Sequence, residues 1–272
     1  GLALGPRTLV MGIVNVTPDS FAGSVTDPDE AASLALRMEE AGADILDIGG
    51  ESTRPGAEPV SEADELARVM PVIERLAGRL GIPISVDTYK AGVAAAALSA
   101  GACIVNDISG LGYDRKLADA VAGSGAAVVL MHTRGRSRQM YREAVYSDVV
   151  VEVAAELRQA MERAEAAGIS ADRIILDPGL GFAKGADDSF TLLAALPRLH
   201  ALGRPLLIGP SRKSFLTAAM GQAAPPERDW GTAAAVTAAI LSGVHIVRVH
   251  EVGPMVQVAR VADAIRTRSP RV

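Results

Sequence analysis

The stretch MGIVNVTPDSF, residues 11–21, is apolar for four residues and becomes polar at Asn15. An apolar run without alternation is typical of a strand that is buried on both faces of a parallel sheet. The Asn, Thr, Pro, Asp and Ser that follow favour a turn or a loop. This stretch therefore predicts a buried parallel strand that ends at a polar edge, and the rest of the chain repeats the pattern.

Seven further apolar runs also end in polar residues. Together with the first, the runs are TLVMGIV, DILDIG, IPISVD, CIVND, AAVVLMH, RIILD, PLLIG and HIVRVH. Ala-rich amphipathic segments, which favour helices, alternate with them near 28–41, 61–80, 90–100, 114–123, 147–167, 187–201, 212–243 (two helices) and 251–266. Asp27 before Pro28 favours a helix start, and Gly101 and Gly168 favour helix ends.

Eight such strand–helix units in 272 residues predict an α/β fold. We expect a single (β/α)8 TIM barrel over residues 1–272, with a parallel eight-stranded core. An open doubly wound sheet stays as the alternative, because parallel strands alone do not establish closure.

Composition excludes several classes of protein. The formal net charge is −5 and no basic run occurs, so we expect no nucleic-acid partner. No apolar run reaches 18 residues and the first residues do not resemble a signal peptide, so we expect no membrane partner. The single cysteine, Cys103, excludes an intrachain disulfide, and its apolar surroundings predict that it is buried. We expect a cytoplasmic protein.

In barrels of this kind the active site lies at the carboxyl ends of the strands. Here all eight ends are polar, carrying Asn15, Glu51 to Arg54, Asp87, Asn106 and Asp107, His132, Asp177, Ser211 to Ser214, and Arg248 with His250. One Asp after a strand is often only a cap or a turn residue. Polar residues at all eight ends instead predict a polar binding site.

The chemistry of these residues divides into two groups. Asp87, Asn106 and Asp177 offer acceptors and one amide, which suits a flat heterocycle with ring N–H groups and an exocyclic amine. Lys213, Arg248, His250 and Arg54 suit a phosphate or another oxyanion. The expected substrate is therefore an aminated heterocycle that also carries a phosphate ester.

Other chemistries are not supported by the sequence. It contains neither the G-x-S-x-G of a serine hydrolase nor the H-E-x-x-H of a zinc enzyme. The glycines of DPGLGFAKG follow the sixth strand rather than the first, so they do not form a dinucleotide fingerprint. We expect His200 and His245 to be structural.

The segments NVTPDSF, GGESTRPG, SVDTYKA, NDISG, LMH, DPGLGFAK, SRKSF and RVH, in this order, resemble the successive motifs of the dihydropteroate synthase family. The resemblance extends from about Met11 to Ile265. It implies a cytoplasmic, homodimeric transferase of folate biosynthesis and a sulfonamide target. The implied reaction joins 6-hydroxymethyl-7,8-dihydropterin diphosphate to p-aminobenzoate, with small-molecule substrates only. It yields 7,8-dihydropteroate and pyrophosphate by SN1-like loss of pyrophosphate, assisted by Mg²⁺, and attack of the aniline nitrogen.

The resemblance also implies a role for particular residues. The metal ligand is Asn15, and the diphosphate contacts are Asn15, Thr53, Arg248 and His250. The pterin contacts are Asp87, Asn106, Ile108, Met131, Asp177, Phe182, Gly209 and Lys213. The p-aminobenzoate contacts are Phe21, Arg54, Pro55, Phe182, Lys213 and Ser214. Lys213, Arg248, His250 and Asp87 are the implied catalytic residues.

The first loop departs from the family pattern. The sequence after Phe21 is about two residues shorter than usual, and Gly23 falls where the family has an aspartate. Asp19 and Asp27 are candidates to substitute for it. Three alternatives therefore stay open: a pterin-binding protein without synthase activity, a methyltransferase between a folate and a corrinoid, and an unspecified barrel enzyme.

Overall fold

Eight parallel strands form the centre of the protein. The computed structural model describes residues 3–17, 25–53, 56–136 and 145–268. The strands are β1 (Leu9–Asn15), β2 (Ile45–Gly49), β3 (Ile84–Asp87), β4 (Ile104–Asp107), β5 (Ala127–Met131), β6 (Ile174–Asp177), β7 (Leu207–Ile208) and β8 (Ile246–Val249). Their hydrogen-bonded order is β6-β5-β4-β3-β2-β1-β8-β7. A single parallel bridge between Leu176 and Leu206 joins β6 to β7, so the sheet is a nearly closed barrel rather than the alternative open sheet.

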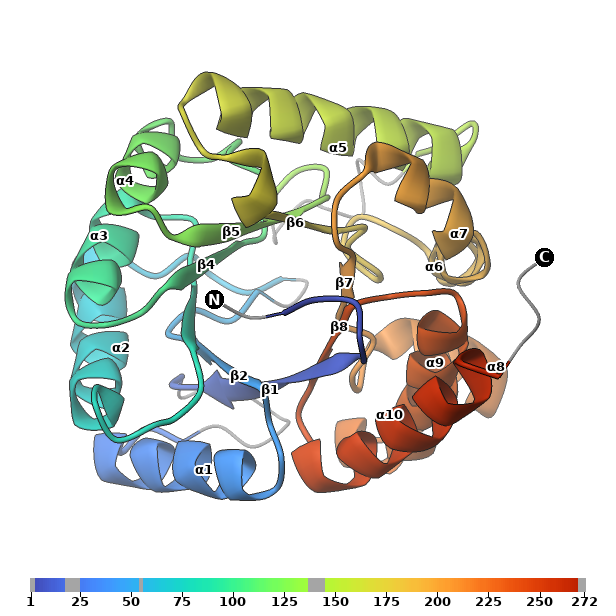
Figure 1. The fold of residues 1–272 in the computed structure, drawn as a ribbon, viewed down its shortest axis with the longest axis horizontal. Coiled ribbons are helices and arrows are strands. Elements are labelled where there is room, and N and C mark those ends of the chain that lie inside the picture. The colour runs from blue at the N-terminus through green and yellow to red at the C-terminus, as the bar shows by residue number, and fades with distance from the viewer. Residues whose placement is uncertain (1–2, 18–24, 54–55, 137–144, 269–272) are drawn as a thin grey trace.

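Helices surround this barrel (Figure 1). They are α1 (Pro28–Glu40), α2 (Glu62–Leu76), α3 (Ala91–Ser99), α4 (Lys116–Ser124), α5 (Val149–Ala166), α6 (Ala186–Ala194), α7 (Leu196–Leu199), α8 (Thr217–Met220), α9 (Asp229–Leu241) and α10 (Val252–Arg266). The expected (β/α)8 architecture is confirmed, and none of the described helices is both long and apolar enough to cross a bilayer.

Local signals set several of these boundaries. Asp27 caps α1 by accepting hydrogen bonds from the backbone N–H groups of Asp29 and Glu30, and Pro28 occupies the first helical position. The helix expected at 187–201 is instead divided into α6, α7 and a 3-10 turn. Pro197, near the start of α7, has no N–H and disfavours an uninterrupted helix there.

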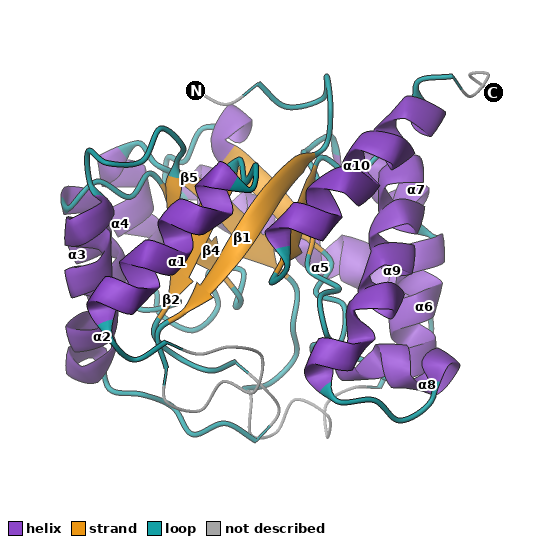
Figure 2. Ribbon diagram, turned by 90° about the horizontal axis from the view of Figure 1, so that it is seen from below, coloured by secondary structure: helices purple, strands orange, loops and turns teal. Residues whose placement is uncertain are grey.

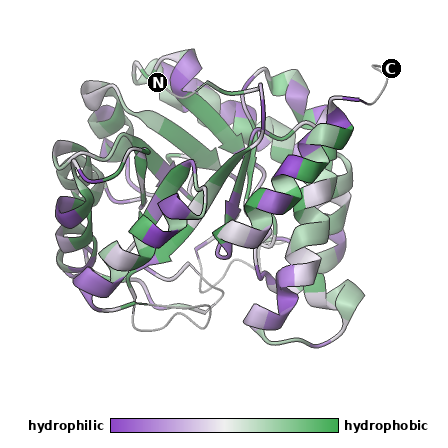
Figure 3. Ribbon diagram, turned by 60° about the horizontal axis from the view of Figure 1, so that its bottom comes forward, coloured by the Kyte–Doolittle hydropathy of each residue, from purple (hydrophilic) through white to green (hydrophobic). Residues whose placement is uncertain are grey.

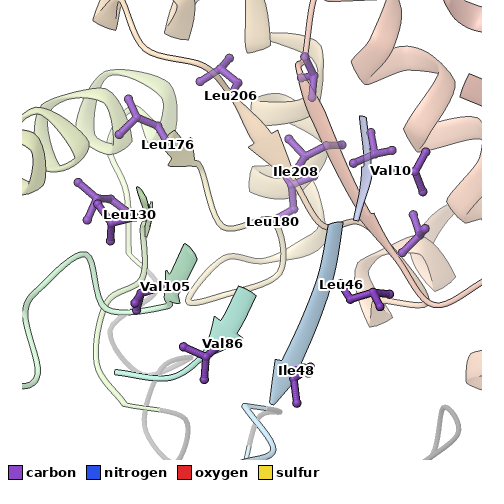
Figure 4. Packing of buried hydrophobic residues seen from close by; sticks show 14 of the residues in the cluster. Val10, Leu46, Ile48, Val86, Val105, Leu130, Leu176, Leu180, Leu206 and Ile208 are labelled. Carbon is purple, nitrogen blue, oxygen red and sulfur yellow. The ribbon is translucent and has the colours of Figure 1, made fainter. Parts of the chain in front are cut away.

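The apolar residues form two layers, one on each side of the strands. Figure 4 shows the larger layer, where Leu46, Val86 and Leu130 point from the sheet toward the helices. The smaller layer fills the barrel, and it consists of Leu9, Met11, Ile45, Ile104, Val129, Ile175, Leu207 and Ile246. Figure 3 shows the same division, with apolar strands inside helices of mixed polarity. The inner layer closes the amino-terminal end of the barrel interior.

One expectation about the core is wrong. Cys103 is exposed rather than buried. It lies directly before β4, at the end of the barrel where the strands begin, and its backbone N–H donates to the carbonyl of Ile84. The apolar run CIVND thus enters the core only at Ile104. In Figure 2 the arrowheads of β1 and β2 point to the opposite end, where loops that follow the strands gather.

Candidate active site

A layer of polar side chains lies directly above the apolar filling of the barrel. Residues two positions apart on a strand point to the same face. Each inner isoleucine is therefore followed, two residues later, by an inward-facing polar group: Ile45 by Asp47, Ile104 by Asn106, Ile175 by Asp177, and Ile246 by Arg248. The alternation of the strands thus builds a polar site on an apolar base.

Asp47 connects three strands in this layer, although the sequence analysis did not select it. Its Oδ2 accepts from Nδ2 of Asn106 at 2.8 Å and from Nε of Arg248 at 2.6 Å. Nη2 of the same arginine donates to Oδ2 of Asp87 at 2.6 Å. The Asp47 side chain is fully buried. A charged residue two positions before the end of an otherwise apolar strand was the signal that could have identified Asp47.

The carboxyl of Asp87 titrates near neutral pH. Burial raises its pKa to about 7, and the negative charges of Asp47, Glu65 and Glu51 act in the same direction. The guanidinium of Arg248 opposes this shift. Asp87 therefore offers two carboxylate acceptors only in the fraction of molecules that have lost its proton, and one oxygen of its protonated form is a donor instead.

Asp177 and Lys213 form the opposite side of the layer. Burial raises the pKa of Asp177, and the positive charge of Lys213 limits the rise. Burial lowers the pKa of Lys213 to about 8, with a further contribution from Arg248. The Lys213 ammonium donates to the carbonyl of Leu180 and lies 4.3 Å from the centroid of the Phe182 ring. A buried lysine with a lowered pKa beside a buried carboxyl with a raised pKa indicates a functional site.

The histidine at the end of β8 is held by a serine from the loop after β7. The Ser211 hydroxyl accepts from the backbone N–H of His250 at 3.1 Å and lies 2.9 Å from its Nδ1. These two contacts fix the position of the imidazole ring beside Arg248, which precedes it by two residues on the same strand end.

The other residues expected in the site lie in different parts of the barrel end that is formed by the carboxyl ends of the strands. Ile108 and Met131 are buried, Gly209 packs beside the Arg248 side chain, Asn15 and Thr53 are half-buried, and Ser214 is exposed at the start of a 3-10 turn (Ser214–Leu216). Phe21, Arg54 and Pro55 lie outside the described residues, as do Asp19 and Gly23 of the first loop. Asp27, the other candidate to replace the missing loop aspartate, is already used as the cap of α1.

Two charged clusters flank the polar layer, and the sequence did not predict either of them. In the first, Lys90 bonds to Glu51 and Glu65, and the hydroxyl of Tyr89 donates to Glu51 at 2.9 Å. This cluster ties the start of the loop after β2 to the start of α3. The second contains His132 and a fully buried lysine, Lys184. Both clusters are formed by residues far apart in sequence, so only the fold brings them together.

A protein-only metal cage is absent from the part of the chain that the structure describes, where no three His, Cys, Asp or Glu side chains are arranged to hold an ion. The donor at the end of β1 is the neutral amide of Asn15. Mg²⁺ commonly takes one or two protein oxygens and completes its shell with water and substrate phosphates. The amide oxygen of Asn15 fits this pattern of few protein ligands.

Known proteins share both this fold and this sequence. The family of pterin binding enzymes matches residues 11–250. Dihydropteroate synthase of Synechocystis is 48% identical over 263 residues, covering 96% of this chain and 91% of that protein. The Bacillus subtilis enzyme of the same name is 46% identical over 266 residues, covering 97% and 90%.

Solved structures agree with the sequence matches. A Yersinia pestis dihydropteroate synthase in a sulfonamide drug complex has a TM-score of 0.93 and 42% identity, covering 96% of this chain and 95% of that one. The Xanthomonas albilineans enzyme in complex with 7,8-dihydropteroate has a TM-score of 0.86 and 42% identity, covering 97% and 95%. The chain therefore belongs to the pterin-binding enzymes and, within them, to the dihydropteroate synthases, the transferases of folate synthesis.

Proposed function

We propose that the polar layer binds 6-hydroxymethyl-7,8-dihydropterin diphosphate and condenses it with p-aminobenzoate. The observation that carries this proposal is the linked set of Asp47, Asn106, Arg248 and Asp87. It offers acceptors and an amide for an aminated ring beside a cation for the diphosphate. Asp177 and Lys213 complete the pterin site, and Ile108, Met131 and Gly209 form its apolar walls. Thr53 and His250 join Arg248 at the diphosphate.

The proposed chemistry is a dissociative substitution. The C–O bond between the pterin methylene and the diphosphate breaks, and the electron pair leaves with the pyrophosphate. The aniline nitrogen then forms the C–N bond with its lone pair and loses a proton. Arg248 and His250 would stabilise the leaving charge, whereas Asp87 and Asp177 would stabilise the cationic pterin. No enzyme nucleophile is required.

Mg²⁺ is the proposed cofactor, with Asn15 as its protein ligand. A bound magnesium ion would neutralise charge on the departing pyrophosphate. Replacing Asn15 by Ala should then raise the Mg²⁺ concentration that gives half-maximal turnover. A metal dependence equal to that of the unmodified enzyme would remove Asn15 as a ligand. Gln159→Ala, which removes an exposed amide on α5, is the matched control and should leave the dependence unchanged.

The second substrate is proposed to bind beside Phe182, Lys213 and Ser214, together with Phe21, Arg54 and Pro55. A related enzyme from Xanthomonas albilineans has been solved with 4-aminobenzoic acid, at a TM-score of 0.89 and 45% identity. The Yersinia pestis complex contains a sulfonamide drug. We propose that sulfonamides compete with p-aminobenzoate in this chain as well.

Release of pyrophosphate from the pterin diphosphate, with and without p-aminobenzoate and Mg²⁺, tests the proposed reaction. A synthase should release pyrophosphate and form dihydropteroate in equal amounts. Binding of the pterin without release would favour the alternative of a pterin-binding protein whose shortened first loop has removed activity. Sulfonamide inhibition that is competitive toward p-aminobenzoate would support the assignment of the second site.

We also propose a cytoplasmic homodimer. Four of the large apolar side chains that are exposed in the described residues lie on α9 and α10, which are neighbours in Figure 1: Trp230, Leu241, Val261 and Ile265. Exposed apolar groups gathered on adjacent helices favour a protein interface. Sedimentation of Val261→Glu should give the monomer mass if this surface is used, whereas Val151→Glu on α5 should leave the dimer intact. The single cysteine is consistent with a reducing compartment.

A further inference from the structure

Lys184 is a buried lysine whose surroundings need an explanation. Only 1% of its surface is exposed, which is exceptional for a lysine. Its Nζ lies 2.8 Å from Nδ1 of His132, 3.2 Å from the carbonyl oxygen of His132 and 2.9 Å from the carbonyl oxygen of Phe182. All three hydrogen-bond partners in the described part of the chain are neutral acceptors. Burial without a contacting carboxylate disfavours the charged form, so the pKa of Lys184 lies well below its usual value.

His132 is built to accept this bond. Burial lowers the pKa of His132 to about 4, and the positive charge of Lys184 acts in the same direction. The ring is therefore neutral at physiological pH. Its Nε2 lies 2.9 Å from Oε2 of Glu156, which must accept a hydrogen bond, so Nε2 holds the ring proton. Nδ1 is left as the acceptor that faces Lys184.

The contacts of Lys184 join the end of β5 to the loop between β6 and α6, residues 178–185. This loop presses closely on β5, since a Cβ at Gly179 would lie 2.0 Å from the carbonyl oxygen of His132. Gly179 has a φ of +69°, which also favours glycine. Ala183, next to the lysine, has a φ of +48°, an uncommon value for a residue with a Cβ. The loop is thus held in a conformation that it would not adopt by local preference alone.

The same loop supplies two contacts of the active site. The carbonyl of Leu180 accepts from Lys213, and the ring of Phe182 lies under the Lys213 ammonium. Lys184 and Lys213 therefore contact two carbonyls of one short loop, those of Phe182 and Leu180 respectively. Any movement of the loop would displace the Phe182 ring and the carbonyl that holds the Lys213 ammonium.

We propose that Lys184 is a positioning residue, which fixes the β6–α6 loop so that Phe182 and Lys213 face the substrates. This inference rests on the proposed function, in which these two side chains contact the pterin and p-aminobenzoate. Lys184 itself contacts neither substrate. A purely structural lysine would affect only the stability of the fold, whereas a positioning lysine also affects kinetics through Phe182.

The test is a double-mutant cycle on kcat/KM for p-aminobenzoate, measured below the unfolding transition of every variant. Lys184→Met keeps the length of the side chain and removes its donors, and Phe182→Ala removes the ring. Misplacement of a site by about 1 Å can reduce catalysis about 100-fold. We expect each single variant to lose about 10- to 100-fold, and Lys184→Met to cost less than about 3-fold once Phe182 is absent.

Two controls distinguish this coupling from general damage. Lys184→Met combined with Asn106→Ala, whose amide bonds to Asp47 rather than to the β6–α6 loop, should give losses that multiply. Lys116→Met, an exposed lysine on α4, should leave kinetics unchanged. If Lys184→Met does not fold, Lys184→Gln replaces it in the cycle. Glutamine has a shorter side chain than lysine but keeps an N–H hydrogen-bond donor.

The outcomes separate the two proposals. Losses that multiply in the Lys184 and Phe182 cycle, or an unchanged kcat/KM in a Lys184→Met variant that melts at lower temperature, would overturn the positioning role. If the unmodified enzyme released no pyrophosphate, the proposed function would fail instead. The cycle would then be read from calorimetric affinities for the pterin diphosphate, where coupling between Lys184 and Phe182 is still expected and independent losses would refute it.

Discussion

Replacement of Arg248 by Met should destabilise the fold as well as the reaction. Arg248 bonds to Asp47 and to Asp87, each at 2.6 Å, and the Asp47 side chain is fully buried. Removing one partner of a buried ion pair costs about 3–5 kcal/mol, because a charge is left without compensation. Asp47 would keep only the amide of Asn106, so the larger part of the loss should arise there.

The loss of folding stability in Arg248→Met should depend on pH, because the carboxyl of Asp87 titrates in this range. Without Arg248 the pKa of Asp87 should rise further above its already raised value of about 7. A carboxyl whose pKa is higher in the folded state binds more protons there, so stability rises as pH falls, by at most about 1.4 kcal/mol per pH unit for each group. The deficit of Arg248→Met should therefore be largest near pH 8 and should shrink toward pH 5.

Urea denaturation of the enzyme and the variant at pH 5 and pH 8 measures both effects. Asp47→Asn in the Arg248→Met background removes the stranded charge and should recover part of the free energy of unfolding. Arg158→Met, an exposed arginine on α5, should change stability by less than about 0.5 kcal/mol. A loss below about 1 kcal/mol at pH 8, or a loss that does not diminish at pH 5, would refute the reasoning.

Three further predictions test other parts of the site. Asp177→Asn should weaken pterin affinity measured by calorimetry, by about 1–3 kcal/mol, because a donor then faces ring N–H groups; equal affinity would remove that role. The kcat/KM for the pterin diphosphate should rise with pH as Asp87 loses its proton near pH 7, and should fall again as Lys213 loses its charge near pH 8. Asp87→Asn should abolish the rise on the acidic side of this profile. Gly179→Ala should lower the melting temperature measured by calorimetry, because its Cβ would meet the carbonyl of His132 and its φ is positive; an unchanged melting temperature would contradict the close packing.

Much of the fold could be predicted because the strands are nearly uniform in character. Each is mainly apolar and is followed by polar residues, so the eight runs located the barrel and its active end. The periodicity of two also carried information about the site. Asp87, Asn106, Asp177 and Arg248 lie at or near strand ends, where a polar residue is noticed, and the structure brings them into one layer.

Asp47 and Lys184 were missed because neither of them lies at the end of a strand. Asp47 lies inside an apolar run, and only the pairing of β2 with β3 and of β1 with β8 brings it between Asn106 and Arg248. Lys184 lies in a glycine-rich segment that gives no sign of burial. Its side chain is buried because β5 pairs with β6, which brings His132 next to the loop that contains Lys184. The expectation for Cys103 was wrong because an apolar neighbourhood does not tell whether a residue precedes or enters a strand.

The balance of charge in the polar layer bears on the proposed reaction. Among the inward-facing groups that the structure describes, the carboxyls of Asp47, Asp87 and Asp177 face the cations of Arg248 and Lys213. With all five ionised the layer has an excess of one negative charge. Burial raises the pKa of both Asp87 and Asp177, and at Asp87 the negative charges of neighbouring carboxylates, Asp47 among them, raise it further. A substrate that becomes cationic as it reacts would relieve the repulsion, whereas a neutral one would not. The layer is therefore arranged to stabilise positive charge on a ring more strongly in the transition state than in the bound substrate, which is the condition for catalysis.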